Sequence, residues 1–138
     1  MTPTKRTTKK VVNDVPEYPI EVDTSTDYYA SVVNFKHNGI TYFHLTPSEH
    51  EFCCGAMLIG DFYTRHDIPD DMIPYLGMAL ERYIARTFHN CVVQCTTISS
   101  QATVEKILEV AGFKRTIRRC HIDPESHGRK RYISGWQR

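Results

Sequence analysis

Chemistry-bearing side chains are densest between His44 and Cys54, where the sequence reads HLTPSEHEFCC. Histidine, glutamate and cysteine are the side chains that zinc prefers as ligands. The spacings of His44, His50 and Cys53 match no compact ligand signature, so we predict no metal site here. Cys53 beside His50 could also pair a thiol nucleophile with a base, but no third residue that would orient the base can be named. Scattered surface histidines are the simpler interpretation.

The cysteine pattern favours buried, reduced thiols over a disulfide framework or a metal site. The number is odd, and no pair has the two-residue separation of a zinc or redox motif. Cys91 and Cys95 are four residues apart, so in a strand they would share one face. Free cysteines are among the most buried residues in proteins. The five are Cys53, Cys54, Cys91, Cys95 and Cys120.

Positive charge gathers at the two ends of the chain, although the formal net charge is only +1 and the middle is acidic. Such asymmetry favours contact with an anionic partner, either nucleic acid or the acidic body of a neighbouring protein subunit. Basic residues next to an aromatic residue could grip a phosphate backbone and stack on a base. The predicted contact residues are Lys5, Arg6, Lys9 and Lys10 near the start and Arg129, Lys130, Arg131 and Trp136 near the end.

The chain length of 138 residues suits one domain with a real core. No run approaches the roughly 20 apolar residues that span a bilayer, so we expect no membrane partner. The first ten residues, MTPTKRTTKK, are basic and polar with no apolar stretch behind them, unlike a secretory signal. We therefore expect a cytoplasmic protein, in a cell's own cytoplasm or in that of an infected host.

The first half of the chain predicts an extended arm followed by strands. Residues 1–27 lack periodicity and contain three prolines, which predicts an arm that only a partner would order. Residues 29–35 and 40–45 read as two strands joined by an Asn38-Gly39 hairpin turn. Residues 52–63 read as a third strand, and its two internal glycines predict a bulge or a close backbone approach.

The second half predicts two helices that alternate with strands. An apolar stripe predicts a first helix from Asp67 to about Phe88, before a strand at 91–98. A second stripe predicts a helix at 101–111 that ends on Gly112. A strand at 113–122 follows, and the basic tail at 123–138 contains one candidate final strand. The predicted fold class is α/β (α+β), with a mostly antiparallel central sheet, two helices, the order βββαβαβ and a domain over residues 28–122.

The stretch from Gln101 to Phe113 resembles a motif of the GNAT acyltransferases. That family has Asn, then Ala three residues later, Tyr seven later and Gly-Phe eleven later. Here Gly112 and Phe113 are in place, while Gln101, Val104 and Leu108 occupy the Asn, Ala and Tyr positions. The resemblance implies the fold, but Leu108 cannot donate the proton that the family's Tyr gives to the departing thiolate.

A second motif of that family, [Arg or Gln]-x-x-Gly-x-[Gly or Ala], binds the diphosphate of acetyl-CoA at a helix N-terminus. Arg65 fits its first position, while Ile68 and Asp70 replace the small residues. Asp67 and Asp71 add two more carboxylates, which would repel a diphosphate. The resemblance thus makes Arg65, Ile68, Asp70 and Gln101 the candidate cofactor contacts, and the same residues argue that no cofactor binds.

The resemblance also supplies candidates for acid–base catalysis. Glu49 and Glu51 lie where the family often places a general base, and Tyr75 or Tyr83 could replace the missing acid. A full domain of this family begins with a strand and two helices that shape the acceptor side, and no helical stripe precedes residue 28 here. The chain is similar in this respect to small GNAT-like proteins of tailed bacteriophages.

The prediction from sequence is therefore a non-catalytic GNAT-like protein with a structural or accessory role, as a phage virion or assembly component. Its arm and tail would contact other protein subunits. The first alternative is an active N-acyltransferase that uses acetyl-CoA. The second is an accessory protein that binds nucleic acid through its basic ends.

Overall fold

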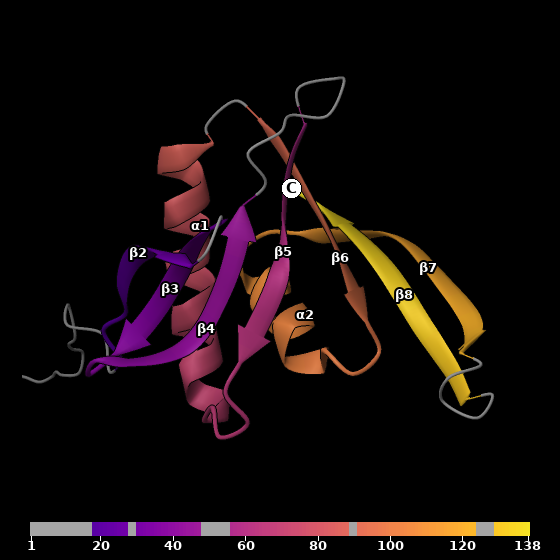
Figure 1. Ribbon diagram of the computed structural model, residues 1–138, viewed down its shortest axis with the longest axis horizontal. Coiled ribbons are helices and arrows are strands. Elements are labelled where there is room, and N and C mark those ends of the chain that lie inside the picture. The colour runs from indigo at the N-terminus through magenta and orange to yellow at the C-terminus, as the bar shows by residue number, and fades with distance from the viewer. Residues whose placement is uncertain (1–17, 28–29, 48–55, 89–90, 124–128) are drawn as a thin grey trace, which may run out of the picture.

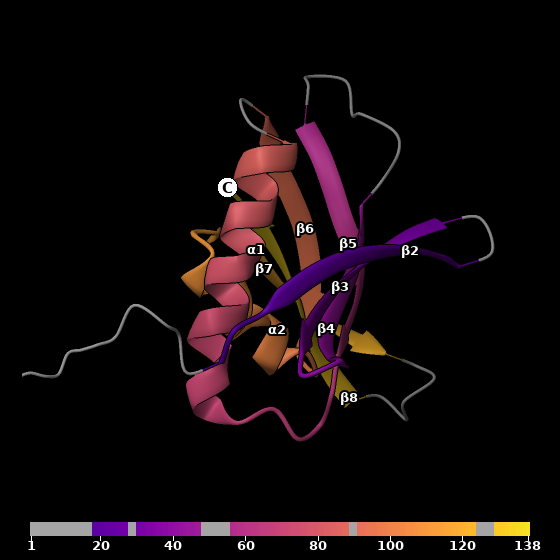
Figure 2. The same cartoon turned by 90° about the vertical axis from the view of Figure 1, so that its left-hand side faces the viewer.

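The computed structural model describes residues 18–27, 30–47, 56–88, 91–123 and 129–138. One sheet carries two helices, and both helices lie on the same face of it (Figures 1 and 2). The strands are β2 (Glu21–Asp27), β3 (Ala30–His37), β4 (Ile40–Pro47), β5 (Ala56–Thr64), β6 (Val92–Ile98), β7 (Lys114–Asp123) and β8 (Arg129–Gln137). A short 3-10 turn, η1 (Asp70–Met72), leads into α1 (Ile73–Thr87), and α2 (Ala102–Val110) follows β6.

Within the part of the chain that the structure describes, the seven strands are ordered β2-β3-β4-β5-β6-β8-β7. Every neighbouring pair is antiparallel except β5 and β6, which run parallel. The predicted fold class, a mostly antiparallel sheet with two helices, is confirmed. The chain places α1 between the two parallel strands, as a parallel connection requires.

Two strands lie outside the predicted domain of residues 28–122. Residues 21–27, which the sequence placed in the arm, form the edge strand β2, so that part of the prediction is wrong. Its residues are mostly polar, so the apolar alternation that predicts a strand is missing, and among the described strands it pairs only with β3. In the predicted tail, the candidate final strand is confirmed as β8, which inserts between β6 and β7.

The predicted hairpin turn and helix end are confirmed, because their residues have positive φ angles, which asparagine and glycine adopt more readily than other residues. Asn38 and Gly39 have φ of 51° and 78°, the left-handed conformation that a two-residue hairpin turn needs. Gly112 has φ of 97° and ends α2. The Gly112 and Phe113 N–H groups donate to the carbonyls of Glu109 and Leu108 at 3.1 and 3.0 Å, which satisfies the last turn of the helix.

The core lies between the sheet and the two helices. Its largest fully buried side chains come from α1, α2 and the central strands, and include Leu76, Leu80, Ile84, Val104, Ile107, Leu108, Phe35, Phe43, Leu45 and Val93. Tyr18 and Ile20, just ahead of β2, pack against this cluster. No helix in the described part of the chain is long and apolar enough to cross a bilayer.

The two helices pack closely against each other at Gly77 of α1. A Cβ added there would lie 2.4 Å from the Val110 Cβ and 3.0 Å from the Ile107 carbonyl oxygen on α2. Backbone and a branched side chain cannot move aside easily, so the contact requires glycine.

We expect Gly77→Ala to lower the free energy of unfolding by about 1–2 kcal/mol. The overpacking cost of about 1–3 kcal/mol exceeds the gain of up to about 1 kcal/mol that alanine brings to a helix interior. Urea unfolding measures the change. Gly60→Ala is the matched control, because no atom lies within 4 Å of its added Cβ. Equal stability of the two variants would contradict the close helix contact.

Candidate functional site: a cleft between two parallel strands

The parallel strands β5 and β6 pair over three residues and then separate. Their register runs from Ala56 opposite Val92 to Leu58 opposite Gln94. Beyond this point β5 continues along β4 and β6 continues along β8, so the two strands splay apart (Figure 1). A cavity of about 640 Å³ lies at the splay, lined by Leu58, Ile59, Gly60, Asp61, Phe62, Cys95, Thr96, Ile98 and Gln101.

A β-bulge shapes the β5 side of this cavity. The register against β4 shifts by one residue between the pairs Thr46–Gly60 and His44–Tyr63. The extra residue is accommodated at Asp61, which has φ of 50°. Aspartate tolerates that conformation better than most residues. The predicted bulge is therefore confirmed, directly after Gly60, and it turns the β5 backbone where no β6 ladder covers it.

Three polar side chains gather beside the bulge on β4 and β5. The His44 and Tyr63 rings have centroids 4.9 Å apart, and the residues are directly opposite each other in the ladder. Burial lowers the pKa of His44, and the nearby Asp61 carboxylate partly opposes this shift. His44 is therefore a neutral imidazole at pH 7, able to accept a proton.

Hydrogen bonds fix the β6 side of the cleft. The Trp136 indole Nε1 donates to the Thr97 hydroxyl at 2.8 Å, and that hydroxyl donates to the Glu105 carboxylate at 2.7 Å. Glu105 also lies 3.6 Å from the Arg115 guanidinium, which stacks over the Trp136 ring. This network, which we call the Trp136 network, joins β6, β8, α2 and β7 around one buried residue pair.

The predicted cofactor contacts divide into two groups. Gln101 lines the cavity, and its Oε1 accepts the Ile98 N–H at 3.0 Å, which holds the turn between β6 and α2. Arg65, Ile68 and Asp70 lie instead in the connection from β5 to α1 and do not line that cavity.

The start of α1 carries negative charge. Arg65 is occupied by Asp67, with the Nε–Oδ1 distance at 2.8 Å, and this ion pair lowers the pKa of Asp67. Asp70 and Asp71 occupy the first turn, and Asp71 accepts a hydrogen bond from the Tyr18 hydroxyl at 3.1 Å. These carboxylates already face the partial positive charge of the helix terminus, so a diphosphate finds no vacant cradle there.

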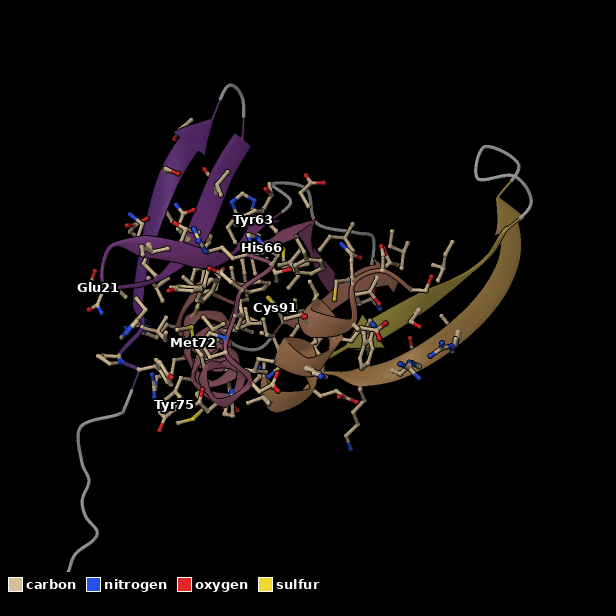
Figure 3. The ribbon with its side chains drawn as sticks, turned by 90° about the horizontal axis from the view of Figure 1, so that it is seen from below. Glu21, Tyr63, His66, Met72, Tyr75 and Cys91 are labelled. Carbon is tan, nitrogen blue, oxygen red and sulfur yellow. The ribbon has the colours of Figure 1, made fainter. Side chains whose placement is uncertain are left out.

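The predicted acid–base residues lie apart from the cleft where the structure describes them. Tyr83 is half-buried against Phe35 and Phe88, and burial raises its pKa. Tyr75, labelled in Figure 3, lies on α1 with its ring edge-on to Tyr18, while Tyr63 lies on the sheet. Neither Tyr75 nor Tyr83 lines the cavity. Glu49 and Glu51 lie outside the described residues, as do Cys53, Cys54 and His50.

Among the predicted partner contacts, Trp136 differs most from the prediction. Its side chain is 2% exposed and its indole N–H is bonded to Thr97, so it cannot stack on a nucleic-acid base, and that prediction is wrong. Arg129, Lys130 and Arg131 belong to strand β8. Lys5, Arg6, Lys9 and Lys10 lie outside the described residues.

Asp61 and Tyr63 are the site residues that the sequence analysis missed, and His44 was interpreted there as a scattered surface histidine. The alternation around Phe43 and Leu45 was a usable signal, because it places His44 on the opposite face of β4 from these two core residues. Nothing in the sequence indicated that the bulge would bring Asp61 beside it. Within the described ranges, no three His, Cys, Asp or Glu side chains form a group that could hold a metal ion.

No family model matches the sequence, and no curated protein matches it closely. The fold does match solved structures. An acetyltransferase from Bacillus subtilis in complex with CoA has a TM-score of 0.58 at 8% identity, over 86% of this chain and 97% of that one. An N-acetyltransferase from Staphylococcus aureus Mu50 has a TM-score of 0.55 at 12% identity, and the match covers 79% of this chain and 67% of that one. A GNAT-family acetyltransferase from Bacillus anthracis has a TM-score of 0.53 at 14% identity, and the match covers 75% of this chain and 64% of that one.

The fold of this chain is GNAT-like. The chain spans about two thirds of the length of the Staphylococcus aureus and Bacillus anthracis proteins. In this chain β2 and β3 are separated by only residues 28 and 29, with Asp27 opposite Ala30, so no helix lies between them. The resemblance that the sequence showed at Gln101 to Phe113 is confirmed at the level of the fold.

We expect the His44 imidazole to titrate below the ordinary value of 6.5 and Asp61→Asn to lower its pKa further. Burial disfavours the imidazolium, and the Asp61 carboxylate favours it, so removing that charge leaves burial unopposed. Asparagine retains the ability to adopt the left-handed conformation of residue 61. NMR titration of the imidazole C–H signals measures both values. An unchanged or raised pKa in Asp61→Asn would show that the two groups do not interact.

Proposed function

We propose that this protein is an acyltransferase that passes an acyl group from a thioester to an amine in the cleft between β5 and β6. The proposal is carried by the bulge at Asp61, which presents the β5 backbone to a cavity of about 640 Å³ where the β5–β6 ladder ends. That volume is in the range of small-molecule sites, about 300–1,000 Å³. The shared fold with solved acetyltransferases supports the same class of reaction.

The backbone and His44 supply the two functions that the reaction needs. Backbone N–H groups of β5 beyond Leu58 have no β6 partner and can donate to the thioester carbonyl oxygen. Such a donor is worth roughly 10²–10³ in rate when it is aimed at the developing oxyanion. His44 does not itself line the cavity, but its ladder partner Tyr63 directly follows the lining residue Phe62. As a neutral imidazole at pH 7, it accepts through one water molecule the proton that the amine loses as it attacks the carbonyl carbon. The carbon–sulfur bond then breaks and the acyl group stays on the amine.

The leaving group explains why Leu108 does not exclude this chemistry. Leu108 is fully buried in the core, at the position where the related enzymes often carry a tyrosine acid. A thiol has an ordinary pKa of about 8.5, so a thiolate departs readily and takes its proton from water. General acid catalysis contributes typically 10²–10⁴ in rate. We therefore propose a slow enzyme rather than an inactive one.

The charge at the start of α1 bears on which part of the thioester is recognised. Asp70 and Asp71 lie in the first turn of η1, and Asp67 is beside them. These groups repel a diphosphate, whereas the cleft is lined largely by apolar side chains and backbone. We propose that the acyl-pantetheine arm carries the binding energy and that the nucleotide adds little.

Calorimetry with acetyl-CoA and S-acetylpantetheine tests this proposal. We expect both to bind, with dissociation constants within about tenfold of each other. Gly60→Leu should abolish binding of both, because its side chain would fill the cavity. Asp70→Asn should tighten acetyl-CoA by up to about fivefold, the upper end for an exposed charge interaction, and leave S-acetylpantetheine unchanged.

Glu109→Gln is the matched control, because it removes one exposed carboxylate at the far end of α2. It should change neither affinity. Absence of binding by both thioesters would rule out the acyltransferase. Tight acetyl-CoA binding with no S-acetylpantetheine binding would rule out recognition through the pantetheine arm.

A non-catalytic accessory role is the second candidate, and a specific observation favours it. The family's acid is replaced by the core residue Leu108, and its diphosphate loop by Asp67, Asp70 and Asp71. A fold that has lost both groups can persist as an assembly component. Failure of both thioesters to bind would leave this role, with a bacteriophage origin still a prediction.

A further inference from the structure

Two further cavities adjoin the cleft, one on each side of it. The cavity on the β4 side has a volume of about 290 Å³, and Thr46 and Gly60 are among its lining residues. The cavity on the β8 side has a volume of about 270 Å³, and Thr116 and Gly135 are among its lining residues. Leu58 lines both cavities and the cleft itself. The three spaces therefore meet at one side chain, and we call them together the trough.

The trough crosses five neighbouring strands, β4, β5, β6, β8 and β7. Thr46 of β4 is opposite Gly60 of β5, and Thr96 of β6 is opposite Gly135 of β8. Thr116 lies on β7, at the far end of the trough. Neighbouring strands are about 4.8 Å apart, so the trough is about 19 Å long, which is the length of about six extended residues.

The trough lies on the face of the sheet that is opposite the two helices. Leu45 and Trp136 are buried in the core between the sheet and the helices. Successive residues of a strand point to opposite faces, so Thr46 and Gly135 belong to the other face. The Thr116 hydroxyl is on that face too, because it lies 3.1 Å from the position of a Cβ added to Gly135. In the described part of the chain, both helices lie on the core side and neither covers the trough (Figure 2).

The lining of the trough is uncharged except at one point. Asp61 is the one charged side chain among the described lining residues, and it borders both the cleft and the cavity on the β4 side. Its side chain is exposed. A ligand of complementary charge therefore carries one cation at the cleft and neutral groups on both sides of it. A polyamine fits poorly, because its other cations would lie against apolar walls without a partner.

We propose that the trough holds an extended polypeptide and that the acyl acceptor is the side chain of a lysine within it. The lysine amine would enter the cleft beside Asp61, and the residues before and after the lysine would lie in the two flanking cavities. An internal lysine needs room on both sides, whereas a terminal amine needs one flank and a small free amine needs neither. Thr46, Thr96 and Thr116 offer hydroxyl groups that can both donate to and accept from main-chain amides.

The transfer step of this inference rests on the proposed function. The neutral lysine Nζ forms a bond to the acyl carbon, and the carbon–sulfur bond breaks. The proton that the nitrogen loses goes through water to His44, and an equal proton reaches the departing thiolate from water, so the products are an amide and a free thiol. Binding of the polypeptide does not require the thioester, so it can be measured by itself.

Fluorescence anisotropy with the full chain and no thioester tests the binding. The probe is an N-terminally acetylated heptapeptide of six alanines around a central lysine, labelled at its C-terminus with a neutral dye. We expect it to bind about two- to fivefold more tightly than the same peptide with norleucine in place of lysine, as one exposed charge pair allows. Asp61→Asn should remove this difference and leave the norleucine peptide unaffected.

A second variant tests the flank on the β8 side. Thr116→Trp would fill that cavity and should weaken binding of the lysine peptide at least about fivefold by steric overlap. Thr24→Trp is the matched control, because Thr24 is an exposed strand threonine on β2, outside the trough. It should leave the dissociation constant unchanged. Circular dichroism verifies that both variants are folded, and the comparison of the two peptides on the unmodified chain does not depend on either variant.

Steady-state kinetics with acetyl-CoA then compare two acceptors, the lysine heptapeptide and Nα-acetyl-lysine amide. We expect kcat/KM to be at least about tenfold higher for the heptapeptide, because its flanking residues contribute binding energy. Equal kcat/KM values would overturn the inference and leave the acyltransferase in place. Peptide binding without turnover of either acceptor would support the trough as a polypeptide site and overturn the proposed function.

Three binding results would also overturn the inference, whatever the turnover. The first is no binding of the lysine heptapeptide. The second is equal affinity for the lysine and norleucine peptides, which would show that no cation is recognised at Asp61. The third is equal weakening by the two tryptophan variants, which would place the peptide outside the trough.

Discussion

The short parallel ladder between β5 and β6 is the constraint on which the rest of the structure depends. It joins an antiparallel sheet of β2 to β5 with a second one of β6, β8 and β7, through three registered residue pairs. Sheets twist, and each half follows its own partners, so the two halves must diverge once the ladder ends. The cleft is the direct result of that divergence. The position of the cleft is therefore fixed by the length of the ladder, whose last pair is Leu58 and Gln94.

The Trp136 network keeps the second half of the sheet in place around this ladder. A buried hydrogen bond contributes only about 1 kcal/mol net, but a buried donor or acceptor left without a partner costs about 1–3 kcal/mol. Thr97 serves as acceptor for the indole and as donor to Glu105, so each group depends on the next. Arg138 adds a second tie, since its Nε donates to the Ala111 carbonyl at the end of α2. The carboxyl-terminal strand is thereby held between two others, where it supports the cleft.

Charge is distributed unevenly along the chain, with carboxylates in excess over residues 18–113 and Lys and Arg in excess over residues 114–138. Carboxylates at the start of α1 disfavour a diphosphate beside the cleft. The small net charge of +1 conceals this separation because the two regions nearly cancel.

The sequence by itself determined the features that depend on neighbouring residues. Asn38-Gly39 fixes a hairpin turn, and Gly112 ends a helix, because few other residues adopt φ above zero. The apolar stripes of α1 and α2 repeat at helical spacing, so both helices were predicted, and α2 nearly to its ends. The predicted start of α1 at Asp67 is wrong, because the α-helix begins only at Ile73, after the 3-10 turn η1. The same local register revealed the GNAT resemblance and the loss of its tyrosine at Leu108.

Tertiary structure alone decided the features that depend on distant residues. Strand β2 has no apolar alternation, and only pairing with β3 makes it a strand. Trp136 looked like a surface contact because its neighbours in sequence are basic, yet insertion between β6 and β7 buries it. His44 and Asp61 meet through a register shift between strands that no residue spacing reveals. Which strands pair, and in which register, is set by the packing of the whole core. A sequence pattern reflects only residues that are close together along the chain.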